Sequence, residues 1–236
     1  MNAKQYFVLV STLILTACAT QQAPSATVSR EGDTVRIEGI ISTETAKQFQ
    51  SLLQGPAPRR VQITSGGGDV VSAIEIATSI FDQGMDVEIQ GGCFSSCANY
   101  IFPAGRHKII DAQGIVGWHG NAEHLLWLDQ QGQDSLPFFG RSLFLDIVRR
   151  EREFFAHIRV NGFVCWFGKI EPFNIENLYF LRPEDMEHFG IRDVQVRSDY
   201  ASTDVSQVLA YGKAQLRLLE IDWSRFEAAA PELSLH

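Results

Sequence analysis

Two adjacent serines at the start of an apolar segment are the first residues of this chain that could do chemistry. Ser95 and Ser96 follow a turn of small residues and lead into a run typical of a buried helix, within Gly91–Phe102. A serine in the first turn of a helix can aim its oxygen into a cleft, and the unpaired N–H groups of that turn can stabilise a developing negative charge. Two further stretches could complete such a site: the glycine-rich Ser65–Asp69 and the histidine-containing Trp118–Gly120.

Acyl transfer by a serine requires a base, a partner that orients the base, and an oxyanion hole. The glycines at 66–68 would let a backbone N–H approach a substrate closely, and the N–H of Cys97 is the natural second donor. His119 ends an apolar strand, where its ring could act as the base, although a lone histidine is more often structural. The glycines could also cradle a phosphate, but the Gly-Lys-Ser/Thr sequence of a P-loop does not follow them.

Strand and helix patterns alternate around these three turns. Alternating or apolar runs predict strands at 34–39, 60–64, 85–89, 108–110 and 114–117, and helical patterns lie at 42–53, at 70–82 and from the serines to Phe102. Short connections between them imply right-handed crossovers and a mainly parallel sheet in an α/β fold. Because sites in such sheets gather at the carboxyl ends of the strands, we expect the three turns to meet.

The second half of the chain predicts helices and loops. The polar stretch 119–137 indicates a loop or lid, 138–160 a long amphipathic helix, 181–190 a short helix and 203–226 a final helix. The aromatic stretch Phe163–Phe173 is expected in the core rather than as an exposed contact surface.

The N-terminus resembles a bacterial lipoprotein signal. Lys4 precedes an apolar run from Tyr6 to Leu15 that is short for a membrane span, and a small-residue cleavage site leads directly to Cys18. The resemblance implies cleavage before Cys18 and acylation of that cysteine, which would anchor the protein to a membrane. No aspartate follows Cys18, which favours the outer membrane and the periplasm. We therefore expect a signal peptide at 1–17, a tether at 18–30 and one domain at 31–236; the alternative is an ordinary secretory peptide with a chance cysteine.

The composition and the cysteines limit the class of protein further. Hydrophobic residues make up 45% of the chain, which argues against disorder, and a formal charge of −8 without a basic stripe argues against nucleic acid as a partner. Cys93 and Cys97 could form a disulfide across one turn beside the serines, or be two small buried residues; Cys165 would stay unpaired. A metal site is disfavoured because further ligands are missing around these cysteines, and we expect no cofactor.

Together the turns resemble the Clp protease proteolytic subunit and the related signal peptide peptidases, within the wider crotonase-like fold. The matching segments occur in the same order along the chain: 63–70 with the triple glycine, Ser96–Ala98 with its helix to Gly105, Val116–His119, and Phe180 to Ile191. The resemblance implies a sheet of ββα-type units with helices packed outside. It also implies Ser96 as nucleophile, His119 as base, and the N–H of Gly68 (or Gly67) in the oxyanion hole. The spacing to Gly105 favours Ser96 over Ser95.

The third catalytic position is where this sequence departs from the family. Leu178 occupies the place of the family's aspartate and cannot orient a histidine. Asn177, our candidate for this role, or Glu176 could do so after a small shift. Losing the aspartate lowers turnover by orders of magnitude without abolishing it.

The leading hypothesis is a lipid-anchored periplasmic serine hydrolase of the endopeptidase type. It would act on peptides or proteins, and the family's rings suggest a homo-oligomer. The alternative is a degenerate relative that binds peptides or partner proteins without cleaving them. A third hypothesis, an acyl-thioester enzyme, is disfavoured by the periplasmic address because coenzyme A is a cytoplasmic ligand.

Overall fold

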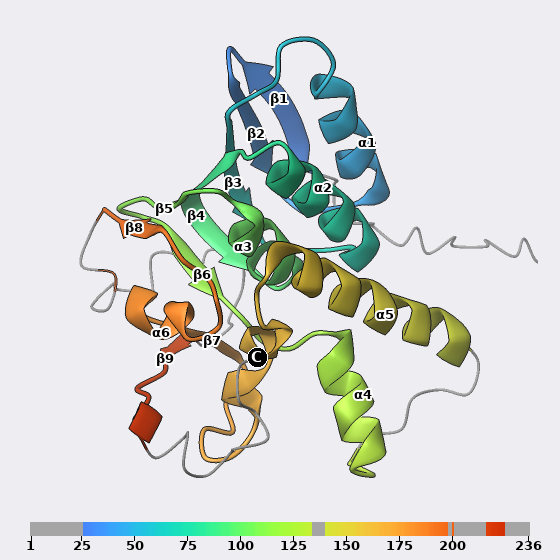
Figure 1. The fold of residues 1–236 in the computed structure, drawn as a ribbon, viewed down its shortest axis with the longest axis vertical. Coiled ribbons are helices and arrows are strands. Elements are labelled where there is room, and N and C mark those ends of the chain that lie inside the picture. The colour runs from blue at the N-terminus through green and yellow to red at the C-terminus, as the bar shows by residue number, and fades with distance from the viewer. Residues whose placement is uncertain (1–25, 134–139, 198–199, 201–215, 225–236) are drawn as a thin grey trace, which may run out of the picture.

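A seven-stranded sheet forms the centre of the computed structural model, which describes residues 26–133, 140–197, 200 and 216–224 (Figure 1). Its strands are β1 (Thr27–Glu31), β2 (Thr34–Glu38), β3 (Arg60–Ser65), β4 (Asp86–Phe94), β5 (Lys108–Ile110), β6 (Ile115–Gly117) and β8 (Val194–Val196). They follow the order β1-β2-β3-β4-β5-β8, and β6 pairs with β4. The β1–β2 pair is antiparallel and every other pair of this sheet is parallel. The predicted α/β fold with a mainly parallel sheet is confirmed.

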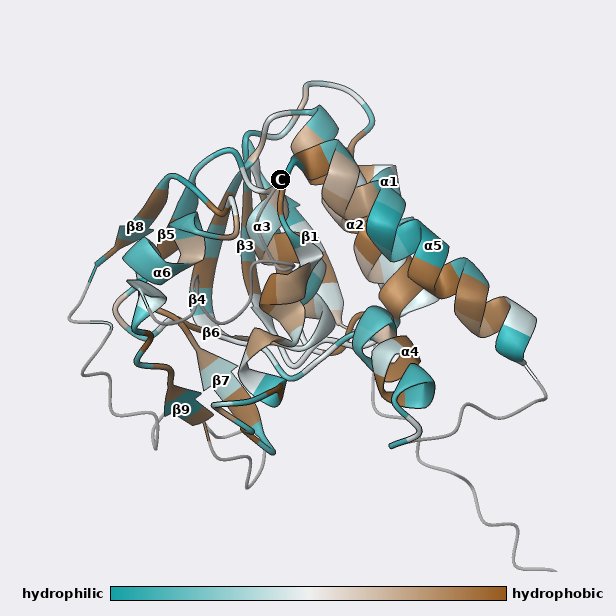
Figure 2. Ribbon diagram, turned by 60° about the horizontal axis from the view of Figure 1, so that its bottom comes forward, coloured by the Kyte–Doolittle hydropathy of each residue, from teal (hydrophilic) through white to brown (hydrophobic). Residues whose placement is uncertain are grey.

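Helices α1, α2 and α5 lie to the right of the sheet in Figure 1. A second sheet, formed by two parallel strands, lies below β6 in the same view. The helices are α1 (Thr43–Leu52), α2 (Val70–Asp82), α3 (Phe102–Ala104), α4 (Ala122–Gln130), α5 (Arg141–Ile158) and α6 (Pro183–Glu187). A π-helix η1 (Cys97–Ile101), the 3-10 turns η2 (Gly162–Cys165) and η3 (Phe167–Lys169), and the strands β7 (Leu178–Phe180) and β9 (Leu216–Leu218) complete the described elements. Hydrophobic residues gather in the central strands, and the helices also carry hydrophilic stretches (Figure 2).

Local capping explains where the first two helices begin. The Ser42 hydroxyl accepts from the Thr45 N–H at 3.2 Å, and the Ser42 N–H donates to Thr45 Oγ1 at 3.1 Å. The Thr45 hydroxyl thus replaces the Glu or Gln side chain that usually completes a capping box. Asp69 starts α2 in the same way, since its carboxylate accepts from the Ser72 N–H at 2.8 Å. This cap also fixes the end of the glycine turn that precedes α2.

Strand β4 changes neighbours along its length, and this change positions the serine turn. Its first half pairs with β5 (Val87 opposite Lys108), whereas its last residues pair with β6. The predicted strand at 85–89 is therefore longer than expected and continues to Phe94. The carboxyl ends of β3, β4 and β6 come together at this edge, so the three turns of interest follow neighbouring strands.

The second half of the chain differs from the expectation at several places, including the strands β7 and β8, which were not predicted. The stretch predicted as a loop contains α4, whose N-cap Asn121 accepts from the His124 N–H at 3.0 Å. The predicted final helix is wrong at Leu216–Leu218, which form β9; the remainder of that prediction, except 219–224, lies outside the described residues. By contrast, the aromatic stretch is in the core as predicted, with Phe163 and Phe167 buried.

The domain boundaries need one change at the N-terminus. Residues 27–30, which the sequence analysis assigned to the tether, belong to β1 and pair with β2. The signal peptide, Cys18 and the first part of the tether lie outside the described residues. Within the described part of the chain, no helix is long and apolar enough to cross a membrane.

A buried carboxylate joins α5 to the start of α4. Glu151, on α5, is fully buried and accepts from the Tyr100 hydroxyl, from the Ala122 N–H at 3.1 Å and from the Glu123 N–H at 3.0 Å. We expect Glu151→Ala to lower the free energy of unfolding by about 3 kcal/mol, because three buried donors lose their acceptor. Urea unfolding measures this change. Glu153→Ala is the matched control: its exposed ion pair with Arg149 is worth less than about 1 kcal/mol, so an equal loss in both variants would contradict the assignment.

Candidate active site

The serine turn is a tight change from strand to helix. Ser95 has φ +56°, in the left-handed region that non-glycine residues rarely adopt. Its N–H donates to Gly117 O at 3.2 Å, and its carbonyl accepts from the Asn99 N–H at 2.8 Å. The chain therefore leaves β4 at Ser95 and becomes helical at Ser96, which puts Ser96 at the N-terminal end of η1.

The Ser96 hydroxyl points at the glycine turn. Ser96 is 3% exposed, and its Oγ donates to Gly68 O at 2.8 Å. Gly68 forms a parallel bridge with Ile41, in which the Ile41 N–H donates to Gly67 O at 2.8 Å and Ile41 O accepts from the Asp69 N–H at 2.9 Å. The Gly67 carbonyl and the Asp69 N–H therefore both face Ile41. The N–H and C=O of Gly68, which lies between them, face the opposite way. Gly68 thus directs its N–H, as well as its carbonyl, toward Ser96.

Two backbone donors are available beside this hydroxyl. Among the described residues, no acceptor takes the N–H of Gly68 or the N–H of Cys97. Glycine is required in the turn because a Cβ on Gly67 would lie 2.8 Å from Ser96 N. Free N–H groups that converge on a helix start are the components of an oxyanion hole. The two donors predicted from the sequence therefore flank Ser96.

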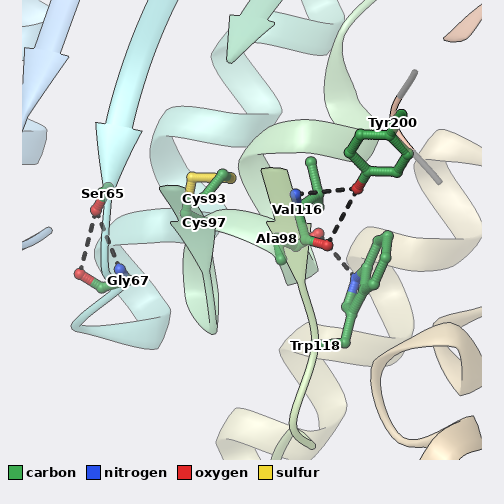
Figure 3. The surroundings of a disulfide bond; sticks show 8 residues. All are labelled: Ser65, Gly67, Cys93, Cys97, Ala98, Val116, Trp118 and Tyr200. Carbon is green, nitrogen blue, oxygen red and sulfur yellow. Dashed lines mark hydrogen bonds between the residues drawn. A yellow bond between two sulfur atoms is a disulfide. The ribbon is translucent and has the colours of Figure 1, made fainter. Parts of the chain in front are cut away.

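A disulfide closes the serine turn. The sulfur atoms of Cys93 and Cys97 are 2.07 Å apart, with a Cα–Cα distance of 5.3 Å (Figure 3). The bond joins the end of β4 to the first residue of η1 and so spans both serines. Ser65, at the end of β3, accepts from the Gly67 N–H at 3.1 Å through its hydroxyl (Figure 3). Cys165 is a buried free thiol.

His119 follows β6 and is fixed by the residues on either side of it. Trp118 exchanges both backbone hydrogen bonds with Tyr179, at 2.8 and 2.9 Å, and its indole N–H donates to Ala98 O at 3.2 Å (Figure 3). On the other side, Asn99 Nδ2 donates to Gly120 O at 2.9 Å. Both Ala98 and Asn99 belong to the helix that starts at Ser96, so this helix holds the histidine segment directly.

The pairing of β4 with β6 brings the segments that carry Ser96 and His119 to the same edge of the sheet. β4 and β6 are paired in parallel, with Phe94 opposite Gly117. Ser96 and His119 each come two residues after this pair, in the segments that continue from the two neighbouring strand ends. His119 is exposed, and no described side chain forms a hydrogen bond with its ring. Since Ser96 Oγ bonds to Gly68 O, it must rotate before it can donate to the imidazole.

The third catalytic position carries a different group from the one expected. Tyr179 forms an isolated antiparallel bridge with Trp118, and this register puts buried Leu178 across from His119. The Gly120 N–H donates to Cys165 O, so the pairing does not continue to Asn177. The side chains of Asn177 and Glu176 are exposed, and among the described residues neither forms a hydrogen bond with His119. The structure therefore does not bring Asn177 to the ring as the sequence analysis expected.

A positive charge, rather than an acid, acts on the His119 ring. Lys169 Nζ donates to Glu176 O and to Asn177 O, both at 2.7 Å. Although His119 keeps an exposed part, the partial desolvation of its ring is the main cause that lowers its pKa, and the positive charge of Lys169 lowers it further. The sequence analysis missed Lys169. Its only signal was that it is the one charged residue in the apolar stretch 162–170.

Removing the lysine charge should change the pH dependence of any reaction that uses His119 as its base. The base works when neutral, so the rate rises with pH as His119 loses its proton. Because Lys169 lowers the pKa of His119, this rise lies at a lower pH than it otherwise would. We expect Lys169→Met to move the acidic limb of the kcat/KM profile to higher pH, and Lys169→Arg to leave it in place. An unchanged limb in Lys169→Met would show that another group controls it.

The sequence matches no known protein family and no curated protein. Among solved structures, a point mutant of ClpP1 from Listeria monocytogenes is similar, with 17% identity, a TM-score of 0.44, and coverage of 71% of this chain and 92% of that chain. An enoyl-CoA hydratase from Mycobacterium avium subsp. paratuberculosis is 12% identical at a TM-score of 0.30, with coverage of 37% of this chain and 47% of that chain. A methylmalonyl CoA decarboxylase is 12% identical at a TM-score of 0.30, with coverage of 39% and 47%. This chain thus spans about half the length of the last two proteins.

Proposed function

We propose that this chain is a serine hydrolase, a peptidase of the Clp protease type, with Ser96 as nucleophile and His119 as base. The observation that carries the proposal is the contact of Ser96 Oγ with Gly68 O at 2.8 Å. It puts a hydroxyl at a helix start against a turn whose unused N–H faces the same space. Such donors are useful only where negative charge develops, as on the carbonyl oxygen during acyl transfer.

The reaction would proceed through an acyl-enzyme. Ser96 Oγ turns from Gly68 O toward His119, whose neutral imidazole takes the hydroxyl proton as Oγ bonds to the substrate carbonyl carbon. The N–H groups of Gly68 and Cys97 bind the oxyanion. His119 gives its proton to the leaving amine as the C–N bond breaks. Water then attacks the ester on Ser96, with His119 again taking and returning the proton, and the acid is released.

We also propose an envelope location. The support is the lipoprotein-like sequence that ends at Cys18, with a signal at 1–17 and lipid attachment to the outer membrane. A disulfide at Cys93 and Cys97 fits an oxidising compartment such as the periplasm. The family resemblance alone suggests a homo-oligomer, and the acidic composition gives no reason to propose nucleic acid as a partner.

A second function is favoured by one specific observation. Leu178 and Lys169, rather than a carboxylate, lie next to the position of His119. Without an orienting acid, the imidazolium formed during attack is less stable, and turnover falls. The chain would then bind peptides or partner proteins at the same site without cleaving them.

Labelling with a fluorophosphonate probe separates the two functions. We expect one probe molecule per chain, located at Ser96 by peptide mass spectrometry. Ser95→Ala should still react, whereas Ser96→Ala should not. A folded wild-type protein that fails to react but captures unfolded peptides would support the binding function, and labelling of Ser96→Ala would exclude Ser96 as the nucleophile.

A further inference from the structure

We propose that the surface next to His119 is a subsite for a carboxylate of the substrate, either a free peptide C-terminus or an acidic side chain. This carboxylate subsite consists of His119, Asn121, His124, Trp166 and Lys169. It rests on the proposed function, because it shares His119 with the catalytic centre and so would receive a group next to the bond attacked by Ser96.

Backbone contacts bring these residues together. The Gly120 N–H donates to Cys165 O at 2.7 Å, which joins the loop after His119 to the 3-10 turns. The Lys169 N–H donates to Trp166 O at 2.9 Å, so both side chains leave one turn of chain. The His124 ring stacks on the Trp166 ring, with centroids 5.4 Å apart. Lys169 is near enough for its charge to lower the pKa values of both His119 and His124.

The subsite has several unused hydrogen-bond donors. Trp166 is 8% exposed, and its buried Nε1 has no hydrogen-bond partner among the described residues. The same holds for the buried Nδ2 of Asn121, whose Oδ1 is occupied by the His124 N–H. Lys169 uses two of its three N–H groups on Glu176 O and Asn177 O, which leaves one. Unsatisfied buried donors are costly, so an acceptor is expected here.

Charge decides which acceptor fits. Lys169 carries a positive charge at neutral pH, while burial, with help from Lys169, lowers the pKa of His124 to about 4 and leaves that ring neutral. Burial lowers the pKa of Lys169, and the charge of the Glu176 carboxylate raises it. Among the described residues, no acid accepts a hydrogen bond from this lysine through its side chain. The Glu123 carboxylate pairs with Arg152 at 2.8 Å, and Glu176 contributes its backbone carbonyl. A group that offers oxygen acceptors and one negative charge, namely a carboxylate, complements this arrangement.

Peptide binding to Ser96→Ala tests the subsite independently of catalysis. Three fluorescent peptides are compared. The neutral reference has an amidated C-terminus, the second has the same sequence with a free C-terminus, and the third is amidated but has an internal glutamate in place of a glutamine. We expect one of the two carboxylate-bearing peptides to bind at least about tenfold more tightly than the neutral one, as for a charge-assisted hydrogen bond. Whichever peptide gains affinity identifies the source of the carboxylate.

Variants made in the Ser96→Ala background assign the effect to these residues. Lys169→Met should abolish the preference for the carboxylate, Lys169→Arg should keep it, and Trp166→Phe, which keeps a ring but lacks Nε1–H, should weaken it. Lys47→Met, which removes an exposed lysine from α1, is the matched control and should change nothing. Equal binding of all three peptides, or a preference that survives in Lys169→Met, would overturn the subsite. If wild type hydrolyses peptides but shows no preference for a carboxylate, only the subsite proposal is wrong. If the protein prefers a carboxylate but neither hydrolyses peptides nor reacts with the probe, only the hydrolase proposal is wrong.

Discussion

Leu178→Asp should raise turnover by about 100-fold or more, because it supplies the carboxylate that the proposed catalytic site lacks. Leu178 lies opposite His119 across the Trp118–Tyr179 bridge, and Cβ atoms of directly opposed residues are about 5 Å apart. A carboxylate at that distance can accept a hydrogen bond from the imidazole, hold one tautomer and stabilise the imidazolium formed during attack. Leu178 is buried, so the new carboxylate also carries a desolvation cost, which its interaction with the imidazolium offsets in part.

The neutral variant Leu178→Asn separates charge from size. It places a polar group of the same shape at the same position but cannot stabilise the imidazolium, so we expect little gain in kcat. Steady-state hydrolysis of an ester or peptide substrate, normalised to the fraction that reacts with the fluorophosphonate, measures both variants. If both fold and both remain at the wild-type rate, either Leu178 does not face the ring or His119 is not the base.

The central part of the fold could be predicted from sequence because its signals are local. Apolar alternation identified the parallel strands, and the glycine turn, Ser96 and His119 each follow one of them directly. Parallel strands end at one edge, so an order of elements was enough to bring these residues together. The spacing of Cys93 and Cys97 likewise made a bridge geometrically possible, and the structure contains it.

The parts that the sequence analysis missed depend on contacts between distant residues. Helix α4 has a small apolar face, with Ala122 and Leu126 buried, and its first turn is held by Glu151 from α5. No local pattern can show such a cap. Lys169 is a similar case: its position near His119 follows from the pairing of Trp118 with Tyr179 and from hydrogen bonds to two carbonyls that precede β7. Its effect on the catalytic base could therefore be recognised only in three dimensions.

The helix that begins at Ser96 holds the segments around it and carries the proposed nucleophile. Ala98 and Asn99 hold the segments on either side of His119 through their contacts with Trp118 and Gly120. Tyr100 donates to the buried Glu151, which caps α4. A shift of this helix would therefore move the nucleophile, the base and the proposed carboxylate subsite together. The proposed catalysis would depend most directly on a rigid placement of the Gly68 and Cys97 N–H groups relative to Ser96.

Gly68→Ala should move the N–H of residue 68 away from its position beside Ser96. Gly68 has φ +144°, and a Cβ there would lie 2.1 Å from Ile41 O, which is backbone and cannot move aside without breaking the bridge. The turn must therefore change conformation, and the N–H that faces Ser96 moves with it. Loss of one oxyanion donor lowers kcat by about 100- to 1,000-fold. The strained backbone and the lost Ile41 contacts should also cost about 3 kcal/mol of unfolding free energy.

Gly66→Ala provides the matched control within the same turn. A Cβ on Gly66 would meet only Ile40 Cδ1, at 3.4 Å, which is an ordinary contact. We expect this variant to keep its stability within about 1 kcal/mol and its reactivity with the fluorophosphonate. Urea unfolding compares the stabilities of the two variants. The rate of labelling, measured at low temperature and normalised to the folded fraction, compares their reactivities. Because the neighbours of Gly68 bond to Ile41 while its own N–H is the proposed oxyanion donor, Gly68→Ala should lose both stability and reactivity. A variant that kept full reactivity while losing stability would remove Gly68 from the oxyanion hole and leave it a purely structural residue.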